Sequence, residues 1–476
     1  MMIPFNQTKI ICTIGPATES KEMMTSLINA GMDVMRMNFS HGNHESHLER
    51  LKTLYEINTD LNTNVASLLD TKGPEVRTHL FKNSKVSIEK DSIVTIYMTE
   101  ILGDETKFSV SYENLYLDVL VGGSILVDDG YLELKVMDID LDKKTIKTKA
   151  LNTHIIKDRR GINIPGAKLN MPFISEKDHA DLKWGCLNRV DYVAASFVRR
   201  ASDIKEIKDI FAKCGNDHTQ IIAKIENAEG VLNIDEIIEI ADGVMIARGD
   251  LGVEVPAEDV PIIQKSIIGK CHIKGKISVT ATQMLESMID NPRPTRAEVS
   301  DVANAIYDGT DAIMLSGESA IGIYPIESVE VMNNIAQRIE RELDRARLVK
   351  RANKNSHDGI ETSIAVSVAY SVIQGDTDII VAPTVSGNTA KLISKFRPDA
   401  RIIALTPNAE KARSLALYNG VEARVFNLEP DTEYLIKEAI KLVKSEYNCK
   451  PGTRVVVTGG FPIGTQTNSF RIIDIK

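Results

Sequence analysis

Eight short apolar runs recur between residues 9 and 318, and most of them alternate with helical patterns. The runs span residues 9–15, 34–40, 65–71, 192–198, 220–226, 243–250, 277–283 and 311–318. Each is apolar enough for a buried parallel strand and ends in polar or small residues. Eight strand-then-helix units predict a (β/α)₈ barrel, an α/β fold whose functional residues gather at the carboxyl ends of the strands.

Two further regions interrupt or follow this rhythm. Residues 72–169 contain alternating or β-rich stretches, such as 85–94 and 131–139, which predict an all-β barrel domain inserted as a lid. Beyond residue 341, strands alternate with helices again and predict a C-terminal α/β regulatory domain over 342–476. The catalytic barrel would then comprise 1–71 and 170–341. The basic stretch 341–354 is expected to be a helix with a solvated charged face.

Composition excludes several classes of partner. The net charge of −9 gives no basic field for nucleic acid or for an anionic membrane, so a phosphate must be held by locally placed cations. No run approaches the ~20 apolar residues of a membrane span, and the first residues lack the layout of a signal peptide. The five cysteines are scattered, with no Cys-x-x-Cys pair. These features predict a cytoplasmic protein with reduced thiols.

Two acidic residues follow neighbouring predicted strands. Glu226 ends the run 220–226 and Asp250 ends the run 243–250, with a stretch of helical spacing over 229–241 between them. At one edge of a parallel sheet both carboxylates can share a divalent cation, and Lys224 lies on the same strand face as Glu226. As a simpler alternative, the two acids could stabilise the starts of neighbouring helices, and Lys224 and Glu226 could form a surface ion pair. The joint placement favours a metal site beside an anionic, oxygen-rich substrate.

A second group of polar residues ends the second and third runs. Arg36 presents a planar fork of donors that suits a phosphoryl group. The residues that offer mostly neutral oxygens with one charge are Asn38, Ser40, Asp70 and Thr71. Such a set suits a monovalent cation better than a second Mg²⁺.

Two other patterns are weaker. His41, His44 and His47 do not have the zinc-protease spacing, and His44 and His47 are expected to be exposed helix residues. In the C-terminal region a strand ends and a helix opens around Gly387. This forms either an anion site or an ordinary helix cap. The polar side chains there are Thr384, Ser386, Asn388 and Thr389.

Together these segments closely resemble the pyruvate kinase family. The matching segments are MRMNFSHG at 35–42, DTKGPEVR at 70–77, ISEKD at 174–178, KIEN at 224–227, ARGDLG at 247–252, ATQMLESM at 281–288, TRAEVSD at 295–301 and MLSGE at 314–318. The resemblance covers essentially the whole chain in order. It implies a bacterial-type member without the extra C-terminal phosphohistidine-like domain, which transfers the phosphoryl group of phosphoenolpyruvate to ADP and gives ATP and pyruvate in the final step of glycolysis.

The resemblance also assigns roles in catalysis. Glu226 and Asp250 would bind Mg²⁺ or Mn²⁺, and Lys224 would face the transferring phosphoryl group. Backbone N–H groups of Gly249 and Asp250 would hold the substrate carboxylate. The other residues implied in substrate binding or catalysis are Arg36 and Thr282, with Ser316 and Glu318 as a possible proton relay. The K⁺ ligands would be Asn38, Ser40, Asp70 and Thr71, and Glu75 matches the pattern of K⁺-dependent members.

Nucleotide binding and regulation follow the family pattern less closely. Positions that match the nucleotide site are Asn38, His41, Arg77 and Arg160, where Arg160 replaces the lysine of many members. Asn388 stands where animal forms activated by fructose-1,6-bisphosphate have arginine, and the loop 459–464 lacks their tryptophan and arginine. We therefore expect a phosphorylated allosteric effector such as AMP or a sugar monophosphate. The resemblance also suggests a homotetramer.

Two other functions compete with this interpretation. Barrel lyases that act next to a carboxylate also hold Mg²⁺ with strand-end Glu and Asp, but need neither the lid nor the oxygen cage. A metabolite sensor that has lost catalysis would not need to keep Lys224, Glu226, Asp250 and Thr282 together.

Overall fold

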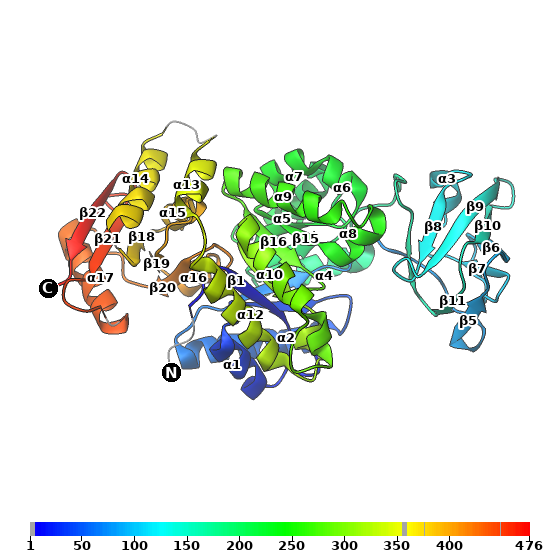
Figure 1. The fold of residues 1–476 in the computed structure, drawn as a ribbon, viewed down its shortest axis with the longest axis horizontal. Helices are drawn as coiled ribbons and strands as arrows, with labels where there is room; N and C mark the ends of the chain where they lie inside the picture. The colour runs from blue at the N-terminus through cyan, green and yellow to red at the C-terminus, as the bar shows by residue number, and fades with distance from the viewer. Residues whose placement is uncertain (1–4, 355–358, 376, 448) are drawn as a thin grey trace.

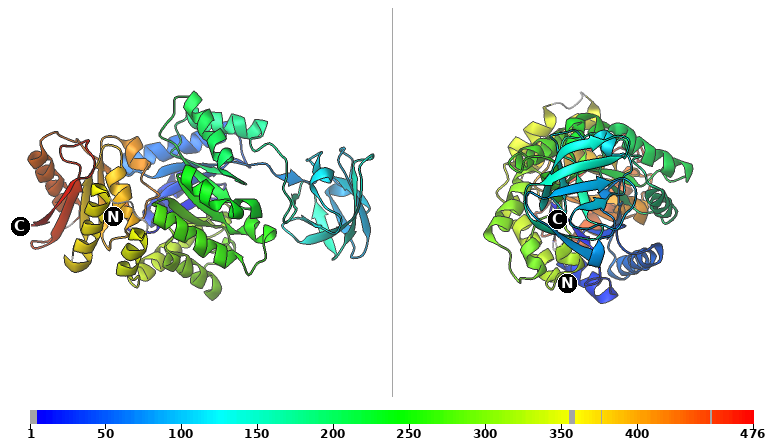
Figure 2. Two further views of the ribbon diagram at one scale, coloured as in Figure 1. Left: turned by 90° about the horizontal axis from the view of Figure 1, so that it is seen from above. Right: turned by 90° about the vertical axis from the view of Figure 1, so that its right-hand side faces the viewer.

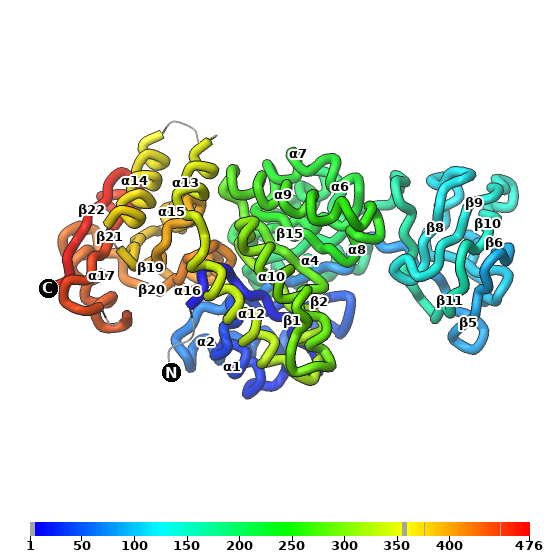
Figure 3. Tube along the Cα trace, in the orientation of Figure 1, coloured from blue at the N-terminus to red at the C-terminus, as the bar shows by residue number. Residues whose placement is uncertain are grey.

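The computed structural model describes residues 5–354, 359–375, 377–447 and 449–476. Three bodies lie in a row along the long axis, with the barrel between the C-terminal α/β part and the inserted β part (Figure 1). Viewed along that axis, the β part lies in front of the barrel (Figure 2). The tube in Figure 3 follows the chain from the barrel into the β part and back. No helix in the described ranges combines the length and apolar character of a bilayer span.

The predicted (β/α)₈ barrel is confirmed. Its strands are β1 (Lys9–Thr13), β2 (Val34–Asn38), β3 (Ala66–Asp70), β13 (Tyr192–Ala195), β14 (Gln220–Ile225), β15 (Gly243–Ala247), β16 (Ile277–Ala281) and β17 (Ala312–Leu315). They close in the order β1-β17-β16-β15-β14-β13-β3-β2, and all pairs are parallel. Almost every strand residue is buried, because the barrel is filled inside and covered by helices outside.

The helices around the barrel begin at recognisable caps. Ser20 caps α1 (Lys21–Ala30), and Thr295 forms a capping box with Glu298 at the start of α10 (Arg296–Asp308). The other helices are α2 (His44–Leu61), α4 (Glu176–Leu187), α5 (Ala201–Lys213), α6 (Ala228–Leu232), α7 (Ile234–Ile240), α8 (Arg248–Glu254), α9 (Val260–Lys274), α11 (Gly317–Ala320) and α12 (Pro325–Glu340), with a 3₁₀ turn η2 (Glu286–Ile289).

The single helix predicted over 229–241 is wrong, because the structure has two helices there. The stretch 229–241 is divided into α6 and α7 at Asn233, which serves as the C-cap of the first helix and the N-cap of the second. The Asn233 side-chain amide donates a hydrogen bond of 2.9 Å to the backbone carbonyl of Arg199. This tertiary contact, which the apolar spacing does not reveal, accompanies the break.

The inserted part has its own sheet and its own core. A seven-stranded sheet runs in the order β4-β12-β8-β9-β10-β6-β7, and β5 pairs with β11. The elements are β4 (Val76–Arg77), η1 (Lys82–Ser84), β5 (Lys85–Ile88), β6 (Ile93–Tyr97), β7 (Lys107–Ser109), α3 (Leu115–Asp118), β8 (Ser124–Val127), β9 (Leu132–Asp140), β10 (Thr145–Ala150), β11 (His154–Lys157) and β12 (Gly161–Asn163). The β-rich stretch 85–94 contains β5 and the start of β6, and the chain turns between them at Asp91, which has a φ of 69°. The apolar core of this part is a separate cluster around residues such as Ile96 and Phe108.

The C-terminal part is a five-stranded sheet in the order β20-β19-β18-β21-β22. Its elements are α13 (Arg345–Asn353), α14 (Ile360–Gly375), β18 (Ile379–Pro383), α15 (Asn388–Lys395), β19 (Arg401–Thr406), α16 (Ala409–Arg413), β20 (Val421–Val425), α17 (Thr432–Glu446), β21 (Arg454–Gly459) and β22 (Ser469–Asp474). The helix expected within 341–354 has a buried face as well as a solvated one, because α13 buries Arg345, Leu348 and Val349.

The C-terminal part closes the barrel at the end where the strands begin. One apolar cluster continues from the barrel interior into this part, joining Leu68 and Met245 to Phe396 and Leu417. Buried ion pairs cross the same interface, with 3.0 Å from Arg413 Nε to Asp191 and 2.8 Å from Arg397 to Asp311. The barrel and the C-terminal part therefore share a core, whereas the lid does not. The boundaries at 71/72, 169/170 and 341/342 stay a prediction.

Candidate active site

Lys224 lies at the carboxyl end of β14 and is almost fully buried. Its ammonium nitrogen is 3.0 Å from Asp70 Oδ1, 3.0 Å from Glu226 Oε1 and 2.8 Å from Ser196 Oγ. Burial alone would lower the pKa of Lys224, but the carboxylates of Asp70 and Glu226 outweigh it and hold that pKa well above its usual value. The lysine is therefore a fixed positive charge at the mouth of the barrel.

Asp70 joins the lysine to Arg36. It ends β3 with 1% of its surface exposed, and its Oδ2 accepts a hydrogen bond of 2.7 Å from Arg36 Nε. Arg36 Nη1 donates to Thr13 Oγ1 at 2.8 Å, while Nη2 has no hydrogen bond within the described residues. Burial would raise the pKa of Asp70, yet the charges of Arg36 and Lys224 keep it below its usual value. Arg36 thus keeps one donor free for a ligand.

Ser196 is a site residue that the sequence interpretation missed. It follows β13, accepts the Lys224 hydrogen bond and donates to the Thr71 carbonyl at 2.7 Å. It also lies 3.2 Å from Asp70 Oδ1. It lies inside the predicted run 192–198, because the apolar residues Phe197 and Val198 follow it, so the end of the run did not mark it as a site residue.

Glu226 and Asp250 come close together, but not on equivalent strand ends. Glu226 follows β14, whereas Asp250 lies in the first turn of α8, three residues after β15 ends at Ala247. Burial raises the pKa of Glu226 to about 7 against the attraction of Lys224, and the charge of Asp250 raises it further. Burial also raises the pKa of Asp250.

The hydrogen bonds of the two carboxylates differ. Glu226 accepts a hydrogen bond of 2.7 Å from the Phe197 backbone N–H. The Asp250 carboxylate has no hydrogen bond or ion pair in the described part of the chain, as expected of a group that awaits a cation. The described residues contain no group of three or more His, Cys, Asp or Glu side chains placed to hold a metal ion. The protein therefore offers two carboxylates, so a bound divalent cation would need further oxygens from substrate or water.

Thr282 adopts a strained backbone next to this pair. Its φ of 67° lies in the left-handed region, where a β-branched residue is an outlier. Two hydrogen bonds hold this conformation. Thr282 Oγ1 accepts a hydrogen bond of 2.8 Å from the Gly249 N–H, and the Thr282 carbonyl accepts one of 2.8 Å from Arg248 Nη2. Arg248 is also paired with Asp301 at 2.7 Å, a supporting role that the sequence interpretation did not assign.

Ser316 and Glu318 lie together after β17. Glu318 is 2% exposed, and its two oxygens accept backbone N–H groups of Ser316 at 2.8 Å and Leu285 at 3.1 Å. Burial raises the pKa of Glu318 above its usual value despite these bonds. The carboxyl group is thus fixed in place, while the Ser316 hydroxyl has no hydrogen bond within the described ranges.

The neutral-oxygen set is brought together by strand pairing. Asn38 on β2 is in register with Asp70 on β3, and the Asn38 amide oxygen accepts 3.0 Å from the Ser40 N–H. Thr71 Oγ1 accepts 3.0 Å from the Ser196 N–H. Ser40 lies in the turn beyond the strand. The single charge in the set, that of Asp70, is already balanced by Arg36 and Lys224.

The nucleotide-site residues divide between the barrel and the lid. Arg77 on β4 and Arg160 are neighbours, because Thr78 N–H donates 2.8 Å to the Arg160 carbonyl. Arg77 forms two hydrogen bonds of 2.8 Å to Glu75, and Arg160 is 3.4 Å from Asp128. Asn38 and His41 belong to the barrel, and His41 is exposed. A ligand that uses all four residues would bridge the two bodies.

His47 does not lie where the sequence predicted. It is 1% exposed, stacks on Phe39 with 4.0 Å between ring centroids, and places Nε2 2.9 Å from the His41 carbonyl oxygen. The expectation of an exposed histidine is wrong because α2 turns this face toward Trp184 and the barrel. His44 is partly exposed and pairs with Asp181 at 2.7 Å.

A cavity of about 370 Å³ lies between the lid and the barrel. Lid residues such as Asp129 and Asn163 line it together with Asp250 and Glu254 of α8. Asn163 donates 3.0 Å to the half-buried Glu254, so the lid and the barrel are hydrogen-bonded beside the site. Asp250 lines this cavity, whereas Lys224 does not.

In the loop before α15, some of the polar side chains already form hydrogen bonds within the protein. Gly387 adopts a φ of 89°, and its N–H donates 3.0 Å to Thr384 Oγ1. Thr389 Oγ1 lies 2.8 Å from Thr467 Oγ1, and both Thr384 and Thr389 are buried. Ser386 and Asn388 are exposed. Of the four predicted effector-site side chains, these two are therefore directly available to a ligand.

A closed parallel barrel that buries a lysine among carboxylates at its carboxyl end defines a (β/α)₈-barrel enzyme for an anionic substrate. The sequence matches the family description "Pyruvate kinase, barrel domain" over residues 5–329 and "Pyruvate kinase, alpha/beta domain" over residues 362–473. The chain belongs to the pyruvate kinase family.

Similar proteins agree with this assignment. A pyruvate kinase of Geobacillus stearothermophilus is 48% identical over 98% of this chain and 80% of its own length. One of Staphylococcus aureus is 47% identical over the same shares. The crystal structure of a pyruvate kinase from Cryptosporidium parvum superposes with a TM-score of 0.93 at 38% identity, covering 98% of this chain and 96% of that one.

The activity is that of the family: phosphoryl transfer from phosphoenolpyruvate to ADP, which gives pyruvate and ATP in glycolysis. The expectation of a pyruvate kinase is confirmed, and the lyase and sensor alternatives are set aside. The five cysteines are all free thiols.

Proposed function

We propose that Lys224 is the catalytic cation for phosphoryl transfer. The supporting observation is its ammonium group, buried at the carboxyl end of the barrel and shared between Asp70, Glu226 and Ser196. A preorganised positive charge stabilises the charge that develops on a transferring phosphoryl group. All three of its donors are engaged, so substrate binding has to exchange one of these partners.

Glu226 and Asp250 would hold Mg²⁺ or Mn²⁺. The unpartnered Asp250 carboxylate and the raised pKa of Glu226 support this assignment, because a pair of desolvated carboxylates is stabilised by a divalent cation. When bound, the ion supplies positive charge that polarises the phosphoryl oxygens. Glu226 is kept in place by the Phe197 N–H, and Asp250 by the first turn of α8.

The remaining substrate contacts follow from donors aimed at the same space. Arg36 would bind phosphate through its free Nη2, since its other bonded donors are fixed by Asp70 and Thr13. Gly249 and Asp250 would present backbone N–H groups to the substrate carboxylate, for which the Gly249 N–H has to exchange its hydrogen bond to Thr282 Oγ1. Thr282 would lie beside the carbon that takes a proton. Ser316 and Glu318 would relay that proton through the fixed carboxyl group of Glu318.

Asn38, Ser40, Asp70 and Thr71 would hold K⁺. Three of these residues offer neutral oxygens, and the charge of Asp70 is already compensated, so the set suits a monovalent ion better than a divalent one. K⁺ would add one positive charge near the phosphate. ADP would bind between His41 and Asn38 of the barrel and Arg77 and Arg160 of the lid, where Glu75 fixes the Arg77 guanidinium.

A phosphorylated effector would bind at the loop 384–389 of the C-terminal part. Exposed Ser386 and Asn388 at the start of α15 support this proposal, and the missing arginine favours AMP or a sugar monophosphate over fructose-1,6-bisphosphate. We further propose a homotetramer, by family likeness, and a cytoplasmic location, where phosphoenolpyruvate and ADP are found.

The test of this mechanism is pyruvate formation by wild type and Lys224→Met. The variant removes the positive charge with little change in length, and turnover should fall by about 10²–10³-fold or more. Lys437→Met, which changes an exposed lysine on α17, should leave turnover unchanged. Equal turnover in Lys224→Met and wild type, both folded by circular dichroism, would remove Lys224 from catalysis.

A further inference from the structure

A cavity of about 560 Å³ lies between the barrel and the C-terminal part. Its barrel side is formed by the loop before β14 and by Asp242, and its other side by α15 and α16 with Ser414. This volume falls in the range of small-molecule sites. None of residues 384–389 lines it, so it is a separate place from the effector site proposed above.

Two lysines in this cavity form no ion pair within the described residues. Lys391 on α15 and Lys411 on α16 have no hydrogen bond or ion pair to their ammonium groups within the described residues, and both are only partly exposed. Lys391 lies 5.1 Å from the centroid of the Tyr418 ring. Burial lowers the pKa of Lys391 and the charge of Lys411 lowers it further, while the carboxylate of Asp242 offsets this only in part. Two like charges that line one cavity are stabilised by an anion bound between them.

The other charges in the cavity do not supply that anion. The third lysine, Lys208, donates 2.7 Å to the Ile240 carbonyl and is 3.4 Å from Asp242, so these two opposite charges offset each other. Asp217 is exposed. The cavity therefore keeps an excess of positive charge although the chain as a whole carries −9.

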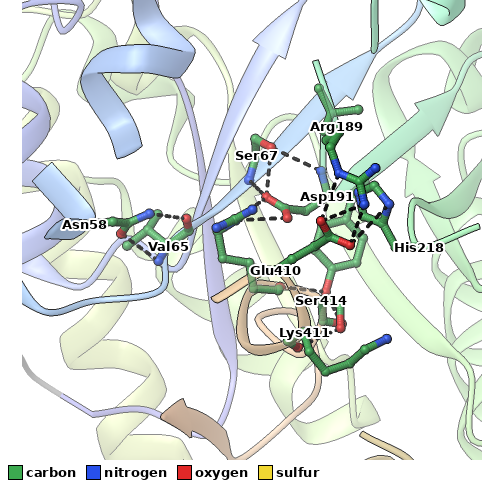
Figure 4. A network of polar contacts seen from close by, with 12 residues as sticks. Asn58, Val65, Ser67, Arg189, Asp191, His218, Glu410, Lys411 and Ser414 are labelled. Atoms are coloured by element: carbon green, nitrogen blue, oxygen red, sulfur yellow. Dashed lines mark hydrogen bonds and ion pairs between the residues drawn. The ribbon is translucent and has the colours of Figure 1, made fainter. Parts of the chain in front are cut away.

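His218 supplies an independent sign of a ligand. It lines the same cavity with 5% of its side chain exposed, and neither ring nitrogen has a hydrogen-bond partner among the residues that the structure describes. Its nearest charged group is Glu410, with 3.5 Å from Nδ1 to Oε1, and Glu410 is held at 2.8 Å by Arg189. Figure 4 shows this cluster, in which the Lys411 side chain extends away from Glu410. An unpartnered buried imidazole is a donor for an incoming oxygen.

We propose that this cavity binds a phosphorylated small metabolite, with its phosphate between Lys391 and Lys411 and a hydrogen bond from His218. A phosphate monoester carries the charge that two lysines need and has acceptor oxygens for the imidazole. The cavity has room for an organic group beyond the phosphate.

The cavity is placed to act on catalysis. Gln220, which lines it, begins β14, and that strand ends one residue before Glu226. Asp242, which also lines it, directly precedes β15, after which α8 carries Asp250. The two strands span about 13–17 Å between the cavity and the catalytic end. A ligand would therefore hold the C-terminal part against the starts of the two strands that lead to the metal site, and this regulatory role rests on the proposed roles of Glu226 and Asp250.

The test is calorimetric titration of the full chain with glycerol 3-phosphate and with inorganic phosphate. Wild type should show a binding event that Lys391→Gln/Lys411→Gln weakens about 10- to 100-fold. Lys391→Arg/Lys411→Arg keeps both charges and should bind nearly as well as wild type. Lys437→Gln, an exposed change on α17, should bind like wild type. Ser386→Ala/Asn388→Ala removes the two exposed side chains of the effector loop and should leave the binding event that depends on Lys391 and Lys411 in place.

Several outcomes would overturn the proposal. Equal binding by wild type and the double Gln variant, or no binding of either phosphate probe to wild type, would mean that the cavity is not a phosphate site. Binding that is lost in Ser386→Ala/Asn388→Ala and kept in the double Gln variant would move it to the effector loop. A bound probe that leaves the KM for phosphoenolpyruvate unchanged would refute the regulatory role. Pyruvate formation without any probe tests the catalytic assignment separately.

Discussion

Lys224 and Asp70 form a buried ion pair across the mouth of the barrel, with 3.0 Å from Nζ to Oδ1. The same carboxylate accepts Arg36 at 2.7 Å, so Asp70 separates two cations that would otherwise repel each other. The pair links β3 and β14, strands that are not neighbours in the barrel. The substrate therefore binds at a site where one carboxylate, that of Asp70, already holds both cations in place.

Asp70→Asn should remove activity and destabilise the barrel. It leaves two desolvated cations without their shared counter-ion, a change that costs about 3–5 kcal/mol when one partner of a buried pair is lost. Urea unfolding and kcat would measure both effects. The matched control is Asp60→Asn, because Asp60 pairs with Lys21 on the exposed surface at 2.9 Å and should change stability by less than about 1 kcal/mol. Equal stability of the two variants would contradict the role given to Asp70.

Asp250→Asn should weaken metal binding more than it weakens the fold. The amide keeps the shape but removes one of two charges, so the Mg²⁺ concentration for half-maximal activity should rise about tenfold or more. Binding of Mn²⁺, followed by its effect on water proton relaxation, gives a readout besides turnover. Asp259→Asn, at an exposed position before α9, is the control. An unchanged Mn²⁺ affinity in Asp250→Asn would exclude Asp250 as a ligand.

His47 should make the protein less stable in acid. Burial lowers the pKa of His47 from 6.5 to about 4, so the folded state favours the neutral ring. Below pH 6.5 the unfolded chain takes up a proton that the folded chain refuses, and stability is lost progressively between pH 6.5 and about 4, by up to about 3 kcal/mol. Urea unfolding at several pH values should show a shallower acid loss in His47→Gln. Exposed His179→Gln should keep the wild-type slope; identical slopes in all three proteins would contradict this origin.

The interface between the barrel and the C-terminal part should depend on one buried pair. Arg413 is 3.0 Å from Asp191, whose side chain is fully buried and also accepts 2.9 Å from the Ser67 hydroxyl. Arg413→Met should destabilise the protein by about 3–5 kcal/mol, because it leaves that carboxylate without a cation. Arg189→Met breaks the more exposed pair with Glu410 at the same interface and should cost about 1 kcal/mol or less. Denaturant unfolding measures both losses of stability. A larger loss in Arg189→Met than in Arg413→Met would contradict this account of the interface.

The sequence predicts the barrel well because its signal is local. Each barrel strand is a short apolar run that ends in polar residues, and the eight barrel strands all fall within the predicted runs. The lid is harder to predict: β4, β7 and β12 are only two or three residues long, too short for an alternating pattern.

The features that the sequence does not reveal are those that tertiary contacts decide. The break at Asn233 and the burial of His47 depend on partners in other elements, Arg199 and Trp184. The site follows the same division. Strand ends predict where Asp70, Lys224 and Glu226 gather, whereas the strained Thr282 and the support from Arg248 depend on contacts between different loops.

The most direct test is pyruvate formation from phosphoenolpyruvate and ADP with Mg²⁺, measured with KCl and then with K⁺ replaced by a large organic cation at equal ionic strength. The account predicts rapid turnover with K⁺ and a collapse without it, because the oxygens of Asn38, Ser40, Asp70 and Thr71 would then lack their ion. Turnover indifferent to K⁺ would remove the role of that oxygen set and of Glu75. No pyruvate under any condition, including added monophosphate effectors, would contradict the central claim.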